Sequence, residues 1–204
     1  MELYDSEEQQ VEAIKDWWKE NGKAVILGTV VGIGGLLGWR FYQDSVVEAQ
    51  EVASDAYSTA ITQLVAQGAD AQDTVQAFIE SNGDSEYATL AALQLAKVQV
   101  EAGELDAALE QLNWAKANSK DTGLNAVAIY RVARILAEQG QNEQAITELE
   151  SLTHQDWAGR VAELRGDILL NSGDKDGAYQ AYSEAQQVAD NSQMLQMKLD
   201  DLAK

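Results

Sequence analysis

The single histidine of the chain, His154, is the first candidate for chemistry because it lies two residues before Asp156 in the segment THQDWAG. An imidazole beside a carboxylate can act as a general base, but covalent catalysis also needs a nucleophile within its reach. The sequence contains no cysteine, and no other nucleophile can be placed near His154. We therefore expect His154 to be structural or solvent-exposed and predict that the chain is not an enzyme. An enzyme would have to work with carboxylates and lysines alone.

Two glycine-containing segments resemble ligand-binding loops but lack the residues that such loops need. In GDKDG, at Gly173 to Gly177, the glycine of a calcium loop falls two places too early, and the twelfth position is Ala185 instead of a glutamate. In GIGGLLG, the third glycine of a phosphate-binding loop is replaced by Leu37, and no predicted strand precedes the segment. The sequence predicts neither a metal site nor a cofactor, and GDKDG is expected to form a turn.

The composition favours helices and an acidic surface. The chain has no proline and is rich in alanine, glutamine, glutamate and leucine, so we predict an all-α protein with one folded domain. Fourteen basic against 34 acidic residues give a net charge of -20, which repels phosphates and excludes nucleic acid as a partner. The acidity either attracts basic or cationic unfolded partners or only keeps the helices soluble, and the sequence leaves both interpretations open.

A run of 16 uncharged residues, Ala24 to Trp39, lies between Lys23 and Arg40. A membrane-spanning helix needs about 17 to 25 residues, and the stems of the flanking cations extend the apolar length. Lys15, Lys19 and Lys23 precede the run, whereas the next basic residue after Arg40 is Lys97, which predicts a cytoplasmic N-terminus. We expect an uncleaved signal anchor, because a cleaved leader would need a less acidic start and a convincing cleavage site.

The glycines of this run leave room for close contact between helices in a membrane. Glycine is a poor choice in a soluble helix, but G-x-x-x-G pairs bring membrane helices together. The predicted packing residues are Gly28, Gly32, Gly34, Gly35 and Gly38. The sequence does not decide between packing against a partner helix and simple tolerance of small residues by the bilayer.

Three turn glycines mark an internal repeat in the remainder of the chain. They occur in EAGELDAALEQL, EQGQNEQAITEL and NSGDKDGAYQAY, at Gly103, Gly140 and Gly173, and are 37 and 33 residues apart. This spacing is close to the period of about 34 residues in tetratricopeptide repeats, which consist of two packed helices. Five residues after each glycine comes a small residue and four further a bulky one, as expected where two helices touch. These pairs are Ala108 with Leu112, Ala145 with Leu149, and Ala178 with Tyr182; the small residues of the preceding helices are Ala96, Ala133 and Gly166.

The two ends of the repeat region are less regular. Residues 44–82 are predicted to form a further helix pair, and the segment from about 190 to 204 is predicted to be an amphipathic helix that covers the last repeat. The predicted domains are therefore a tail at 1–22, a transmembrane signal anchor at 23–42 and a repeat domain at 43–204. Four arginines fall on the first helices of the repeats, which line the concave groove in such arrays. They either pair with the abundant acids or recognise a carboxylate. The candidate groove residues are Tyr130, Arg131, Arg134 and Arg165.

The order of these parts resembles the YfgM family. The resemblance covers essentially the whole chain and is carried by the paired tryptophans of the tail, the glycine-rich span and the segments YATLAALQLAK, YRVARILAEQG and AELRGDILLNSGD. It implies an ancillary subunit of the SecYEG translocon in the inner membrane of Gram-negative bacteria, with the repeats in the periplasm. It also implies a link with the chaperone PpiD, the passage of secretory proteins to periplasmic chaperones, and contact of the tail with the regulator RcsB.

We therefore predict a membrane-anchored, chaperone-like protein that binds SecYEG, PpiD and unfolded secretory proteins. The alternative is a structural scaffold in an inner-membrane complex that binds one folded partner and never touches unfolded chains.

Overall fold

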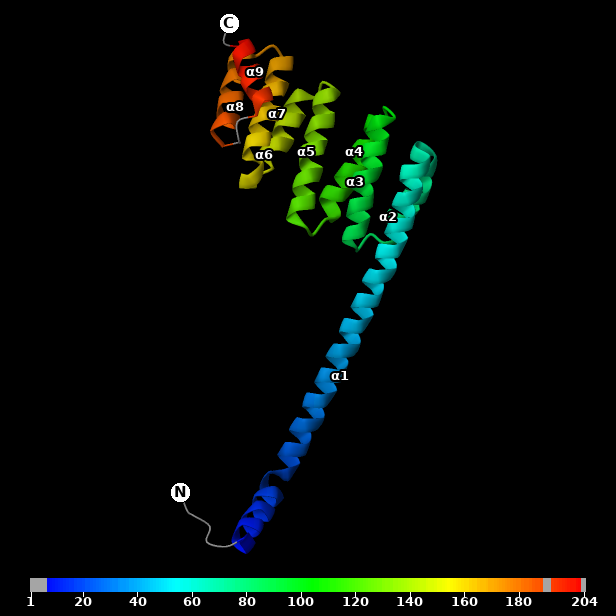
Figure 1. Cartoon of the computed structure of the whole chain (residues 1–204), viewed down its shortest axis with the longest axis vertical. Coiled ribbons are helices and arrows are strands. Elements are labelled where there is room, and N and C mark those ends of the chain that lie inside the picture. The colour runs from blue at the N-terminus through cyan, green and yellow to red at the C-terminus, as the bar shows by residue number, and fades with distance from the viewer. Residues whose placement is uncertain (1–6, 189–191, 203–204) are drawn as a thin grey trace. The chain divides into compact units, whose positions relative to one another are not determined.

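The computed structural model describes residues 7–188 and 192–202, and throughout these ranges the regular structure is helical (Figure 1). The chain divides into two compact units, residues 1–52 and 53–204, which are described separately. The predicted all-α fold with repeated helical hairpins is confirmed.

The first unit contains most of helix α1 (Glu7–Gln67), which includes the glycine-rich run. An 18-residue window of this helix has a mean hydropathy of 1.6, and none of it is buried within the protein. Its large apolar side chains, such as Leu36 and Leu37, are exposed, so the run is not the core helix of a soluble domain. Thr29 donates its hydroxyl to the carbonyl of Val25 at 2.8 Å, which satisfies this polar group within the helix. By length and composition, α1 can cross a membrane.

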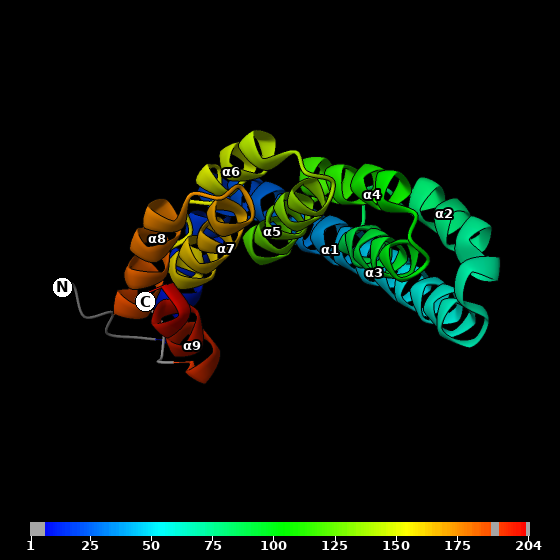
Figure 2. The same ribbon diagram turned by 90° about the horizontal axis from the view of Figure 1, so that it is seen from above.

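The second unit begins with the end of α1 and continues as helical hairpins in chain order. A short 3₁₀ turn, η1 (Gly68–Ala71), connects α1 to α2 (Gln72–Ser81). Three hairpins follow, α3 (Glu86–Glu101) with α4 (Leu105–Asn118), α5 (Thr122–Glu138) with α6 (Asn142–Glu150), and α7 (Ala158–Asn171) with α8 (Lys175–Val188); η2 (Gln155–Trp157) precedes α7, and α9 (Gln193–Leu202) ends the series. The first helices α3, α5 and α7 are neighbours, as Figure 2 shows for the green, yellow-green and yellow ribbons.

The turn inside each of these three hairpins is built in the same way. At Gly140, φ is 74°, in the left-handed region that glycine adopts without a steric cost. The N–H of Gln141 donates to the carbonyl of Leu136 at 2.8 Å, and the N–H of Gly140 donates to Ala137 at 3.0 Å. This pair of bonds is the Schellman arrangement that satisfies the last carbonyls of a helix. Gly103 and Gly173 make the equivalent bonds, so the predicted glycine turns are confirmed.

The predicted small and bulky positions form the core of the hairpins. Ala108, Ala145 and Ala178 are fully buried, and Leu112, Leu149 and Tyr182 are at most 1% exposed. In the third hairpin, Gly166 takes the place of an alanine because a Cβ there would overlap the ring of Tyr182 and lie 3.1 Å from its Cζ. A larger residue on one helix is thus matched by a smaller one on its partner.

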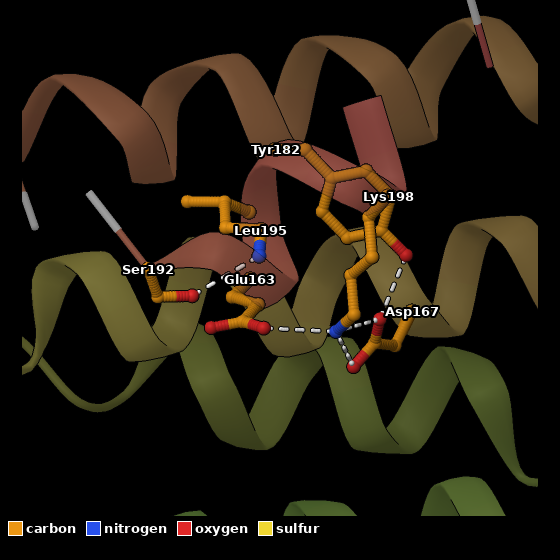
Figure 3. Close-up of polar contacts among 6 residues, drawn as sticks. All are labelled: Glu163, Asp167, Tyr182, Ser192, Leu195 and Lys198. Carbon is orange, nitrogen blue, oxygen red and sulfur yellow. Dashed lines mark hydrogen bonds and ion pairs between the residues drawn. The ribbon is translucent and has the colours of Figure 1, made fainter. Parts of the chain in front are cut away.

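Helix α9 covers the last hairpin through apolar and charged contacts. Leu195 and Leu199 are buried in a cluster that includes Tyr182. Lys198 donates to Glu163 at 2.8 Å and to Asp167 at 2.7 Å, and the hydroxyl of Tyr182 donates to Asp167 at 2.7 Å (Figure 3). The ends of the predicted capping segment, 190–191 and 203–204, lie outside the described residues.

Candidate functional site: a groove on the first helices of the repeats

A cavity of about 790 Å³ lies on the face formed by α3, α5 and α7. Its walls combine apolar side chains, among them Val100, Ile135 and Leu164, with charged ones. Val100 is 41% exposed, which is unusual for a valine beside a packed core. The six charged lining residues are Lys97, Glu101, Arg131, Arg134, Glu138 and Asp167. A concave surface with apolar walls and a few charges is suited to binding a segment of another protein.

The charges of the groove differ from those of the chain as a whole. Three cations and three anions line it, although the whole chain carries -20. Lys97 lies 3.7 Å from Glu101, so these two charges offset each other. Asp167 is bound by Lys198, which comes from α9 and is not part of the lining. The charges left without such a partner among the described residues are those of Arg131, Arg134 and Glu138.

Arg131 is held in place by the neighbouring repeat. Its Nη1 donates to the backbone carbonyl of Leu93 on α3 at 3.0 Å, which links the guanidinium on α5 to the first helix of the preceding repeat. Burial and the positive charge of Arg134 lower the pKa of Arg131 from its ordinary value. A guanidinium remains charged after such a shift. The groove therefore contains a fixed, half-buried cation.

The other predicted groove residues have different surroundings. Tyr130 packs against Trp157, with 5.3 Å between ring centroids, and burial raises the pKa of its hydroxyl. Arg165 forms an ion pair with Glu184 on α8, and the cavity lining does not include it. Of the four predicted residues, the structure brings Arg131 and Arg134 together in the groove, while Tyr130 supports the packing behind it.

The glycines of the span form an open surface. A Cβ built on Gly28, Gly32, Gly34, Gly35 or Gly38 would meet nothing within 4 Å. No described part of the chain therefore requires glycine at these positions. The role in helix packing stays a prediction.

The residues first considered for catalysis are placed on the surface and in a turn. His154 is half exposed, with Nδ1 3.5 Å from Asp156. The segment GDKDG begins α8, where the N–H of Gly177 donates to Asp174 at 2.9 Å, as in an ordinary helix start. In the part of the chain that the structure describes, no three His, Cys, Asp or Glu side chains come together as metal ligands.

Comparison with known proteins places this chain in a family. Residues 15–204 match the family model described as a tetratricopeptide repeat-like domain. The ancillary SecYEG translocon subunit of Escherichia coli is 38% identical over the full length of both chains. That of Haemophilus influenzae is 34% identical over 96% of this chain and 97% of its own.

The chain belongs to the family of ancillary SecYEG translocon subunits. The resemblance to the YfgM family is thereby confirmed. The relatives are named as translocon subunits, and nothing in the comparisons indicates a catalytic activity.

Solved structures with low identity share the fold alone. The Pseudomonas aeruginosa PilF structure superimposes with a TM-score of 0.60 at 19% identity, covering 76% of this chain and 69% of that one. MamA from Desulfovibrio magneticus gives a TM-score of 0.60 at 14% identity over 74% and 82% of the two chains. Both comparisons support the repeat architecture of this chain.

Reasoning from the sequence missed two features of this family member. Val100 and Lys97 line the groove, but they belong to α3, whereas the predicted residues were chosen from the arginine-rich helices further along. The contact of Lys198 with Asp167 was also not predicted. The repeat period could have indicated the first feature, because Val100 lies three residues before Gly103 as Ala137 does before Gly140, and both line the cavity.

Proposed function

We propose that this chain is a membrane-anchored, protein-binding subunit of the SecYEG translocon whose groove holds segments of other proteins. Membership of the family supports association with SecYEG, because the relatives carry that name. The single observation that carries the binding role is the partly apolar groove of about 790 Å³ on α3, α5 and α7.

The proposed topology places the repeats in the periplasm. Three lysines precede the apolar run and only Arg40 follows it closely, which favours a cytoplasmic N-terminus at the inner membrane. We propose the corresponding division into a tail at 1–22, an anchor at 23–42 and a repeat domain at 43–204. Emerging secretory proteins would then meet the groove on the side of the membrane to which they are delivered.

Anchoring would allow a weak groove to act efficiently. A binder tethered beside its target experiences a high effective concentration of that target, so modest affinity is sufficient. Weak binding also permits release, which a protein that passes clients to other chaperones requires. The glycine-bearing face of α1 would contact membrane helices of SecYEG or PpiD, since small side chains permit close packing in lipid.

The named partners follow from the family resemblance. PpiD would be a partner of the anchor, and unfolded secretory proteins would be partners of the repeats. RcsB would be a partner of the tail, of which residues 1–6 lie outside the described structure. These assignments make the protein an intermediate between the translocon and periplasmic chaperones.

Site-specific photo-crosslinking in native membranes tests the proposal. Probes replace Gly28 and Gly34 in the span and Val100 and Arg134 in the groove, and a matched control probe replaces Glu110, which is exposed on α4 outside the cavity. We expect adducts with SecYEG or PpiD from the span and with secretory chains from the groove.

The pattern of adducts separates the proposal from the scaffold. One stable, folded partner at the groove, with no secretory chains, would favour the structural scaffold. An absence of adducts from every probe would refute both functions. Equal labelling at Glu110 and in the groove would show that the groove is not the binding surface.

A further inference from the structure

We propose that residues 9–21 lie along the membrane surface at the N-terminal end of the span, with one apolar face of this segment buried in the lipid headgroup region. The inference goes beyond the proposed binding role and rests on one part of it, the membrane anchor in α1. The segment carries four large apolar side chains that are exposed: Val11, Ile14, Trp17 and Trp18. Ile14 is 66% exposed and Trp17 is 54% exposed, so no described part of the chain covers them.

The four apolar side chains share one face of the helix. Ile14 lies three residues after Val11, and the two tryptophans lie three and four residues after Ile14, which is the spacing of neighbours on a helix surface. Glu12, Asp16 and Lys19 follow one another at the same spacings on the opposite side. Lys19 donates to Asp16 at 3.2 Å, and both side chains are largely exposed. A helix with a tryptophan-containing apolar face and a charged face is typical of a segment that lies in the membrane interface.

The helix can turn onto the membrane surface at Asn21 and Gly22. Nδ2 of Asn21 donates to the carbonyl of Trp17 at 3.0 Å, which is the carbonyl that accepts the backbone N–H of Asn21 in a regular helix. A side chain that competes for a helix carbonyl is a known cause of a bend. In Figure 1, the first turns of α1, drawn in dark blue, are turned away from the axis of the turns that follow. Gly22 also leaves room for Trp18, because a Cβ at this glycine would lie 3.2 Å from Cε2 of the indole.

The direction of this segment decides how deep its apolar face lies. Val11 precedes Ala24, the start of the uncharged run, by 13 residues. On a straight helix perpendicular to the membrane, Val11 would lie about 20 Å from the hydrocarbon layer, beyond a headgroup region of about 5–8 Å. On a segment that lies along the surface, Val11 and Ile14 reach the depth of the tryptophans, which are enriched in this region. Only the second arrangement removes the whole face from water.

The position and the charge of the segment favour lipid as the group that covers this face. The segment continues directly into the apolar run of α1, so the lipid around that run lies next to it. Residues 9–23 carry three acidic and three basic side chains, so they are neutral in a chain with a net charge of -20. A neutral segment needs no anionic lipid, and its attachment depends on the burial of apolar and aromatic surface.

Electron paramagnetic resonance on the full-length protein in phosphatidylcholine nanodiscs tests the inference. The chain contains no cysteine, so spin labels can be attached to single-cysteine variants. Val11→Cys and Ile14→Cys report on the apolar face, and Glu12→Cys and Asp16→Cys are matched controls on the opposite face at similar distances from the span. We expect labels at 11 and 14 to collide more often with oxygen, which concentrates in lipid, than with a water-soluble nickel chelate. The control labels should show the reverse order.

Two further variants test whether the apolar face causes the contact. With the label at position 11, Ile14→Glu should shift the collisions toward the nickel chelate. Lys19→Gln changes the net charge by the same amount on the opposite face and should leave the label in lipid. Both side chains are exposed, so neither substitution should disturb the folding of the repeats.

The outcomes separate this inference from the anchor on which it rests. A label introduced by Leu36→Cys reports on the anchor, and its accessibility to the nickel chelate would contradict the proposed anchor itself. With that label in lipid, equal access of the chelate to both faces of residues 11–16 would overturn the inference. Shielding of positions 11 and 14 from both reagents would assign the face to contact with a second copy of the chain and would also overturn it. A contact that required added anionic lipid would refute its apolar basis.

Discussion

The contact between Gly166 and Tyr182 offers the sharpest test of how the repeats are packed. A methyl group at position 166 would overlap Cδ1 and Cε1 of the tyrosine. The ring cannot easily move, because it is fully buried and its hydroxyl lies 2.7 Å from Asp167. Overpacking of this kind costs about 1–3 kcal/mol. Because the methyl group would overlap two atoms of a ring that cannot easily move, we expect a cost at the upper end of this range, about 2–3 kcal/mol. Replacing glycine by alanine inside a helix returns about 1 kcal/mol, so Gly166→Ala should lower the free energy of unfolding by about 1–2 kcal/mol.

The other two hairpins indicate a second substitution that should compensate for Gly166→Ala. They use alanine opposite leucine, Ala96 with Leu112 and Ala133 with Leu149, where the third uses glycine opposite tyrosine. Tyr182→Leu alone should cost about 2–4 kcal/mol, because it leaves a cavity and removes the donor to Asp167. The double variant restores the alanine–leucine pair, so the two costs should fall short of additivity by at least about 1 kcal/mol.

Urea denaturation of the full-length protein in detergent, followed by circular dichroism, measures all four proteins of this cycle. Hydrogen exchange on α7 and α8 serves as a local control, since the change should be confined to this hairpin. Our account of the packing would be wrong if Gly166→Ala were as stable as the unaltered chain, or if the two substitutions were simply additive.

Three further perturbations test a turn, the cap and the buried tyrosine. Gly140→Ala should lower the free energy of unfolding by about 1 kcal/mol, since φ is 74°, and Gly140→Asn should cost less in the same urea titration. Lys198→Met should leave Asp167 without its ion pair and reduce hydrogen-exchange protection in α9 while α3–α6 stay unchanged. Burial and the hydrogen bond to Asp167 raise the pKa of Tyr182 above its ordinary 10.0, so the unfolded chain loses this proton first and stability falls as the pH rises above that value. Urea titrations at about pH 9 and about pH 11 measure this loss of stability. Between these two pH values, the free energy of unfolding should fall less for Tyr182→Phe than for the unaltered chain, and it should fall by the same amount for Tyr179→Phe.

The repeats were predictable because their determinants are local. Each repeat has a glycine that specifies the turn. A small residue follows five positions later and a bulky residue four positions after that, and these two specify one side of the helix contact. All three copies follow this pattern. The exchange of Ala133 for Gly166 at equivalent positions is explained only when Tyr182 is seen opposite. A larger side chain on one helix is compensated by a smaller one on the helix that it faces. The period of the repeat alone does not show which side chains face each other.

The extent of α1 was less evident from the sequence. The apolar run ends at Trp39, and polar residues such as Asp44 follow, so hydropathy places the end of the anchor near residue 42. The helix nevertheless continues to Gln67, because residues 39–67 include no glycine or proline and Gly68 then adopts a φ of 60°. Hydropathy reports the surroundings of a helix, whereas its end is set by the backbone.

The roles of the arginines could not be resolved before the contacts were known. Arg134 and Arg165 look alike in the sequence, as each lies on the first helix of a repeat. In the structure, Arg165 finds Glu184, which is 19 residues away, while Arg134 finds no described carboxylate within pairing distance. Whether a cation is neutralised depends on long-range packing, so a sequence can suggest a groove but not its free charge.

Helix α9 contributes to the groove without lining it. Asp167 belongs both to the cavity and to the contact with Lys198, which lies 31 residues further along the chain. Lys198 also lies 2.8 Å from Glu163, so one ammonium group is shared between two carboxylates of α7. By holding Asp167 in an ion pair, the cap that closes the apolar core of the last hairpin also fixes one of the charged side chains that line the groove. The partly exposed contact between α9 and α7 therefore both closes the end of the repeat array and holds a lining residue of its groove.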